Sequence, residues 1–167
     1  MSATEKSCFL VNVAKDSVFI LIQGKATFLN ASTFKQFIDN ALDKKQYHFV
    51  IDFENCTGMD STFLGIIAYL GLQIKSIKAP SVLIVRNLNK RNNELFHNLG
   101  LHNFITTEDS LLTEDAQPNE FTELEEAKKF EAIDVLKAHQ NLVLASKNNA
   151  SIFKDVINIL ENKLAQD

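Results

Sequence analysis

The sequence has few residues of the kinds that mark disulfide-rich, metal-binding or membrane-spanning proteins. Its 167 residues include two cysteines, two prolines, five glycines and no tryptophan. Cys8 and Cys56 cannot form a disulfide framework, and with four scattered histidines they show no metal-ligand spacing. No apolar run reaches the roughly 18 residues that a membrane-spanning helix needs. We therefore predict two buried, unreactive cysteines, no metal and no membrane span.

Motifs for secretion and for nucleotide binding are also missing. The opening MSATEKSCFLV has no basic stretch leading into an apolar core, so it predicts a cytoplasmic protein. The chain has neither a GxxxxGK[ST] loop nor a GxGxxG turn after a strand, so we expect no nucleotide or other cofactor. A formal net charge of -4 argues against nucleic acid as a partner.

Residues 1–107 alternate between short β-rich runs and amphipathic runs, which predicts an α/β domain with a mixed sheet and packed helices. YHFVIDF is apolar on both faces and so predicts a central buried strand. The expected strands are Cys8–Val13, Val18–Gln23, 47–53, 81–85 and an edge strand at 102–107, and the expected helices are 30–45, 61–79 and 89–101.

The last sixty residues have a different character. Residues 108–120 are acidic and contain Pro118, which predicts a solvated linker. Residues 121–167 predict a pair of helices, at 122–145 and 148–166. The second helix carries one apolar stripe, formed by Ile152, Phe153, Val156, Ile157, Leu160 and Leu164.

The helix predicted at 61–79 has more apolar surface than a single sheet-facing stripe requires. Gly65 and Gly71 interrupt it, and each costs about 1 kcal/mol relative to alanine, so they are expected where the helix approaches a sheet closely. The excess surface can be covered by the C-terminal helices or by a partner, and the sequence does not choose between the two.

Ser61 follows Asp60 at the turn from a strand into this helix. It fits three roles: a helix-capping residue, a nucleophile or a phosphate acceptor. The nucleophile role has no GxSxG motif and would need a histidine partner, for which His97 and His102 are the candidates. A phosphate would meet the free N–H groups of the helix N-terminus, which favour an anion.

The stretch FVIDFENCTGMDSTFLG resembles the hallmark of STAS domains, the bacterial anti-sigma factor antagonists. In that family, a buried strand ending in Asp runs through a short loop into Asp-Ser and a helix. The order of the predicted elements also looks like that fold, over about Cys8 to Thr107. The last sixty residues lie outside the resemblance.

The resemblance implies a switch protein with no catalysis of its own and a transcriptional output. Unphosphorylated antagonists of this family bind a GHKL-type serine kinase that is also the anti-sigma factor, and so release sigma. Phosphorylation abolishes binding, and a PP2C-type phosphatase restores it. The phosphoserine maps onto Ser61, with Thr62 as a minor candidate. The implied partner-binding positions are Met59, Asp60, Ser61, Thr62 and Phe63, with Gly24 and Asn30 on the same side.

The sequence departs from the family pattern at two places. Many members read DSSGLG, whereas Thr62 and Phe63 replace the second serine and the glycine here, and Lys25 stands where a carboxylate is frequent. An alternative is a STAS scaffold, as in stressosomes and other signalling complexes, in which Ser61 is only a cap and binding runs through the tail helices. The tail helices could also join two copies of the chain.

Overall fold

The computed structural model describes residues 6–108 and 118–166, and within them it confirms the predicted α/β fold with a mixed sheet and a helical C-terminal extension. The strands are β1 (Cys8–Val13), β2 (Val18–Ala26), β3 (His48–Asp52), β4 (Cys56–Met59), β5 (Val82–Arg86), β6 (Thr106–Glu108) and β7 (Thr122–Glu123). The helices are α1 (Ala31–Asp43), α2 (Ser61–Ser76), α3 (Lys90–Asn98), α4 (Ala132–Ala145), α5 (Asn149–Ile152) and α6 (Lys154–Ala165), with a 3-10 turn, η1, at Leu101–Asn103.

The sheet runs in the order β6-β5-β3-β2-β1-β7, and β4 pairs with the end of β2 beside this path. β1 and β2 form the predicted antiparallel hairpin. β2, β3, β5 and β6 are parallel, and the connections between them contain the helices α1, α2 and α3. The run YHFVIDF thus supplies the predicted central strand β3, although His48 and Val50 on its other face are only half-buried.

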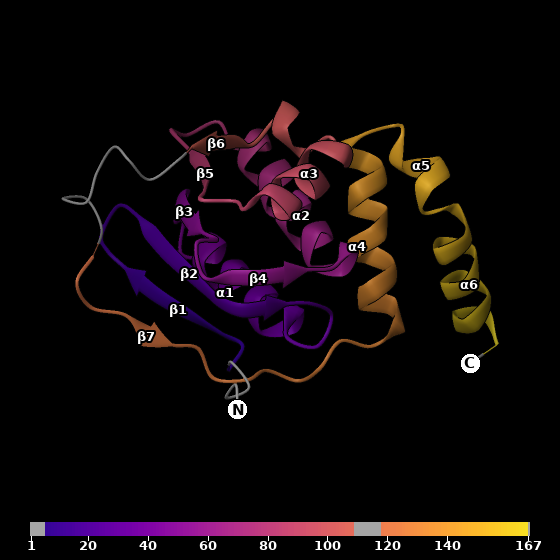
Figure 1. Ribbon diagram of the computed structural model, residues 1–167, viewed down its shortest axis with the longest axis horizontal. Helices are drawn as coiled ribbons and strands as arrows, with labels where there is room; N and C mark the ends of the chain where they lie inside the picture. The colour runs from indigo at the N-terminus through magenta and orange to yellow at the C-terminus, as the bar shows by residue number, and fades with distance from the viewer. Residues whose placement is uncertain (1–5, 109–117, 167) are drawn as a thin grey trace.

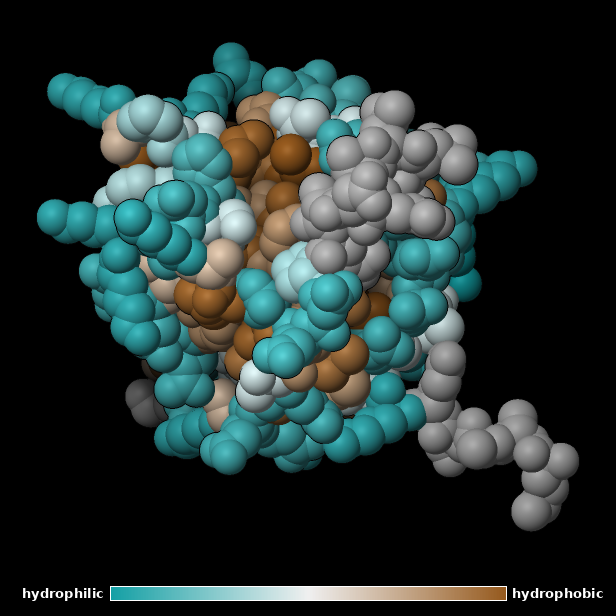
Figure 2. All heavy atoms as spheres, turned by 90° about the vertical axis from the view of Figure 1, so that its left-hand side faces the viewer, coloured by the Kyte–Doolittle hydropathy of each residue, from teal (hydrophilic) through white to brown (hydrophobic). Residues whose placement is uncertain are grey.

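The strands bury alternate side chains, and α1 and α2 cover the buried face. The core contains Phe9, Ile20 and Phe49 from the sheet and Phe34 and Phe63 from the two helices, all almost fully buried. In Figure 1 the strands lie to the left, α4 lies beyond α2, and α6 is the outermost layer on the right. Figure 2 looks at the strand side, where apolar side chains gather in a hollow ringed by hydrophilic ones.

The two predicted tail helices are placed differently from the prediction. The first begins at Ala132 rather than residue 122, because Glu131 and Asp134 form a reciprocal capping box there. The preceding segment is extended, and its strand β7 pairs with β1 through Leu10 and Val11.

The second predicted tail helix is interrupted at Phe153, which separates α5 from α6. The single apolar stripe predicted for this helix is therefore divided between buried and exposed positions. Phe153 is buried and Ile157 is half-buried against the core, whereas Ile152 and Val156 are exposed.

The cysteines, a short additional strand and the predicted linker compare with the sequence analysis as follows. Cys56 is buried, and burial raises the pKa of its thiol, while Cys8 is half-buried. The strand β4 was not predicted, because its sequence CTGM has too few β-forming residues to stand out. The linker predicted at 108–120 falls mainly on residues 109–117, which lie outside the described part of the chain.

The tail covers the excess apolar surface of α2. A Cβ atom added to Gly65 would lie 2.3 Å from the carbonyl oxygen of Ala138, so α2 and α4 meet backbone to backbone. Gly71 faces the side chains of Phe104 and Ile105, which leave no room for a Cβ atom there. The two glycines therefore allow close approach, but to α4 and to the segment before β6 rather than to the sheet. Among the described residues, no helix is long and apolar enough to cross a membrane.

Candidate functional site

The loops before α1 and α2 meet at one end of the sheet. The first part of β2 pairs with β3, up to Leu21, and its end, from Gly24 to Ala26, pairs with β4. The register shifts between Gly24 and Lys25. Gly24 has φ = 74°, a left-handed conformation that glycine adopts without strain. The pairing of Ala26 with Met59 then places the 25–30 loop beside the start of α2.

The Asp60 carboxylate caps α2 and also accepts a hydrogen bond from the 25–30 loop. One carboxylate oxygen accepts a hydrogen bond from the Phe63 amide at 2.9 Å, which is the usual geometry of an N-cap. The other oxygen accepts from the Phe28 amide at 2.8 Å. Asn30 closes the loop internally, because its side chain accepts from the Thr27 amide and donates to the Lys25 carbonyl. The predicted capping role of this turn is therefore carried by Asp60, while the Ser61 side chain makes a different contact.

The Ser61 hydroxyl contacts a side chain from the C-terminal tail. Its Oγ lies 2.9 Å from Nε2 of His139, which is on α4 and 78 residues further along the chain. His139 is only 3% exposed, and the ring of Phe153 packs edge-on against it with a centroid distance of 5.2 Å. Ser61 itself is half-buried.

The hydrogen-bond partners of His139 assign its tautomer. Its Nδ1 lies 2.8 Å from the carbonyl oxygen of Val135, which can only accept, so Nδ1 carries a proton. In the neutral ring Nε2 then has a free lone pair, and it accepts the proton of the Ser61 hydroxyl. Both nitrogens are therefore satisfied in a site that water barely reaches.

This pair resembles the first two members of a serine hydrolase triad, but its surroundings differ. Nδ1 faces a backbone carbonyl instead of a carboxylate, and Phe153 covers the ring where a substrate would need space. The histidines proposed from sequence, His97 and His102, do not contact Ser61. They stack on each other with ring centroids 4.3 Å apart.

The other predicted site residues divide between the surface and the core. Met59 and Asp60 are half-buried beside Ser61, Asn30 is half-buried on the neighbouring loop, and Gly24 is buried within β2. Thr62 is 5% exposed and Phe63 is fully buried. The Phe63 ring packs on Phe34, with centroids 4.9 Å apart, so the residue that replaces the family's glycine belongs to the core.

Sequence reasoning missed three residues at this site. Phe28 and Leu29 project from the loop held by Asp60 and are 52% and 59% exposed, which is unusual for such large apolar side chains. Two adjacent bulky apolar residues in a loop were the available signal. His139 had no signal, because only the tertiary structure brings it to Ser61.

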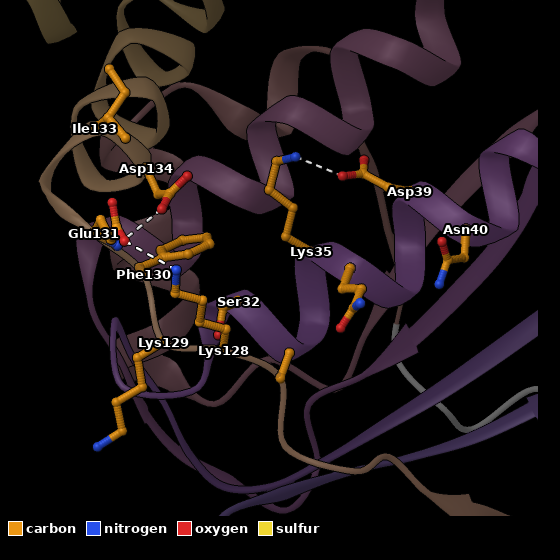
Figure 3. A pocket seen from close by; sticks show the side chains of 12 residues that line it. Ser32, Lys35, Asp39, Asn40, Lys128, Lys129, Phe130, Glu131, Ile133 and Asp134 are labelled. Atoms are coloured by element: carbon orange, nitrogen blue, oxygen red, sulfur yellow. Dashed lines mark hydrogen bonds and ion pairs between the residues drawn. The ribbon is translucent and has the colours of Figure 1, made fainter.

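A groove of about 560 Å³ lies nearby, between α1 and residues 127–134 (Figure 3). Lys35 bridges Asp39 at 2.6 Å, and Lys128 pairs with Glu131 at 3.3 Å. Since most of its charged side chains pair with one another, we assign no ligand to this groove. In residues 6–108 and 118–166, no cluster of three or more His, Cys, Asp or Glu side chains could hold a metal ion.

Asp60→Ala should lower the free energy of unfolding by about 1 to 2 kcal/mol, because it leaves two backbone amides without an acceptor. Urea unfolding of the full chain measures this loss. Asp60→Asn keeps an acceptor oxygen for one amide and should lose about half as much. Equal losses in the two variants would show that the carboxylate does not stabilise the turn through these bonds.

Comparison with known proteins identifies the family of this fold. The STAS domain family model matches residues 10–113, which is more than half of the chain, so the protein belongs to the STAS domain family. The matched region contains most of the hairpin, the central strand β3 and the Asp60–Ser61 turn. No protein with a curated description matches the chain.

Solved structures share this fold at low sequence identity. The anti-sigma factor antagonist SpoIIAA in its unphosphorylated form is 16% identical, with a TM-score of 0.52, and the match covers 61% of this chain and 88% of SpoIIAA. The phosphorylated form of SpoIIAA from Bacillus is 18% identical, with a TM-score of 0.52 and coverages of 64% and 94%. A putative anti-sigma factor antagonist from Thermotoga maritima is 19% identical, with a TM-score of 0.56 and coverages of 64% and 89%.

Proposed function

We propose that this protein is an anti-sigma factor antagonist that works as a partner switch controlled by phosphorylation of Ser61. The observation that carries the proposal is the position of Ser61 in the first turn of α2, beside the capping carboxylate of Asp60. The similar SpoIIAA structures are described in a phosphorylated and an unphosphorylated form. In this proposal the chain has no catalytic activity of its own.

The start of α2 can accept a phosphate without unfolding. A phosphoryl group on Ser61 adds about -1.5 to -2 charges at pH 7. The first turn of a 16-residue helix supplies N–H groups and the positive end of the helix dipole, which stabilise that charge. The Asp60 carboxylate lies alongside, so phosphorylation makes the local surface strongly negative.

The partner surface in this proposal combines an apolar rim with this switchable charge. Phe28 and Leu29 supply exposed apolar area, and Met59, Asp60 and Ser61 lie next to it. The partner of unphosphorylated protein is a GHKL-type serine kinase that also inhibits sigma, so binding releases sigma. Like charges brought together at an interface cost several kcal/mol, so a phosphate at Ser61 expels this partner. A PP2C-type phosphatase then resets the switch.

The proposal is tested by incubating the full-length protein with ATP and the GHKL-type serine kinase encoded in the same genome. Mass spectrometry should find one phosphate, on Ser61, and none on Thr62, whose side chain is buried. The Ser61→Ala variant, which lacks the acceptor hydroxyl, is the control and should stay unmodified. Phosphate on another residue, or none on a protein that binds the kinase, would contradict the switch.

The tail supports a second candidate, a STAS scaffold that binds through its helices. Leu144, Ile152 and Ile159 are 73%, 53% and 66% exposed on the outer side of α4, α5 and α6. A surface of this kind suits a protein partner or a second copy of the chain. Binding of the kinase without modification of Ser61, lost when Ile159 is changed to Glu, would favour the scaffold over the switch.

A further inference from the structure

We propose that helix α4 is an intramolecular gate on Ser61: the docked helix withholds the hydroxyl, and a phosphate on Ser61 keeps the helix from docking again. This inference rests on the proposed function for its biological meaning. Its physical basis is the contact between Ser61 and His139 and the close packing of α4 on α2, which hold whether or not a kinase is known.

The docked helix α4 limits access to the Ser61 hydroxyl. The Ser61 proton is already donated to Nε2 of His139, at 2.9 Å, and α4 lies directly over the start of α2. A kinase must bring the γ-phosphorus of ATP in line with Oγ, which requires the His139 ring to leave. Phosphorylation therefore proceeds from a state in which α4 is undocked.

Phosphorylation removes the hydrogen bond that Ser61 donates to His139. Phosphoserine has no hydroxyl proton, so Nε2 of the neutral ring loses its donor and instead faces phosphate oxygens, which also accept. His139 is 3% exposed, so water cannot replace the lost donor. A buried acceptor without a partner costs about 1 to 3 kcal/mol, a range equivalent to roughly 5- to 160-fold in the docking equilibrium.

The close packing of α4 on α2 transmits a change at Ser61 to the whole of α4. Ala138 is next to His139, and its backbone lies against Gly65 with no room for even one methyl group. An added phosphoryl group at Ser61, one helical turn before Gly65, therefore has little room while α4 stays packed on α2. Displacing His139 therefore lifts α4 off α2 and exposes the core residues that α4 contributes, Ala138 and Leu142.

The segment before α4 keeps the released helix close. β7 pairs with β1, and the Ala127 amide donates to Oγ1 of Thr33 on α1 at 3.0 Å. These contacts do not involve α2, so they remain when α4 undocks. The tethered helix keeps a high effective concentration and returns once the phosphate is removed.

The test is hydrogen exchange, followed by mass spectrometry, of full-length protein with phosphoserine placed at position 61 during translation. Amides of α4 should exchange on the order of a hundredfold faster than in the unmodified protein. Ser61→Ala removes the donor without adding charge or volume, so its increase should be about tenfold. Unchanged exchange in β3 and β5 shows that the domain stays folded.

A pair of glycine variants tests the same gate without changing Ser61. Gly65→Ala places a methyl group against the Ala138 carbonyl and should undock α4, while the alanine itself favours the helix conformation of α2. Gly58→Ala, where an added Cβ meets nothing within 4 Å, is the matched control. The first variant should speed exchange in α4 at least tenfold, and the second should leave it unchanged.

The outcomes separate the gate from the proposed function. Exchange of α4 in the phosphoserine protein that is no faster than in Ser61→Ala, or slower than in the unmodified protein, overturns the gate. Slower exchange would mean that His139 binds the phosphate and holds α4 in place. A kinase that fails to modify Ser61 even in the Gly65→Ala protein, with α4 undocked, instead overturns the proposed phosphorylation switch.

Discussion

Phe63→Ala should lower the free energy of unfolding by about 3 to 5 kcal/mol, the range for deleting a buried aromatic ring. The Phe63 ring is fully buried and packs between Phe9, at a centroid distance of 5.9 Å, and Phe34, at 4.9 Å. Its removal leaves a cavity where both helices meet the sheet. Calorimetry should show the melting temperature falling by about 10 °C.

Phe28→Ala is the matched control, since Phe28 lies at the same site but is 52% exposed. It should change the unfolding free energy by less than about 0.5 kcal/mol. If Phe28 contributes to partner binding as proposed, the same variant should weaken binding while leaving stability intact. A Phe63→Ala protein as stable as the Phe28→Ala protein would show that the ring does not hold the core together.

Ser61→Asp should weaken binding of the 167-residue chain to the GHKL-type kinase proposed as its partner by at least about 100-fold, as expected when like charges are brought together at an interface. The new carboxylate would lie beside Asp60, in the first turn of α2. The helix N-terminus favours this charge, so the variant should remain folded. Isothermal titration calorimetry measures the affinity, and circular dichroism checks the fold.

Ser61→Asn separates charge from size in this experiment, because asparagine has nearly the shape of aspartate but is neutral. It should lose less than about tenfold in affinity, as should Ser61→Ala. If asparagine and aspartate weaken binding equally, the switch acts through shape, and the electrostatic explanation fails.

The sequence predicted those parts of the structure that depend on local pattern. The apolar run YHFVIDF predicted the central strand, which lies between β2 and β5. His48 and Val50 are only half-buried, because α1 and α2 cover the other face of the sheet. The Asp60–Ser61 turn could be predicted because capping residues act within three positions along the chain. The roles proposed for Ser61 and its neighbours in binding remain predictions.

The parts that could not be predicted depend on contacts between distant residues. β4 forms because Gly58 and Met59 pair with the end of β2. The strand propensities of its own residues are too low to predict it. The contact between Ser61 and His139 joins residues 78 positions apart. Residues 122–131 have helix-forming composition but lie extended along the β1 edge and past α1, which shows tertiary pairing overriding local propensity.

The short strand β7 also protects the molecule from its own sheet. Without it, β1 would present a row of unpaired N–H and C=O groups at the outer edge, next to an apolar strand face. Such an edge recruits strands from other chains and begins aggregation. β7 occupies Leu10 and Val11, the middle of that edge, and the salt bridge of Lys6 with Glu123, at 2.6 Å, places charge beside them. Because β7 is anchored independently of α4, the helix can leave α2 without opening this edge to self-association.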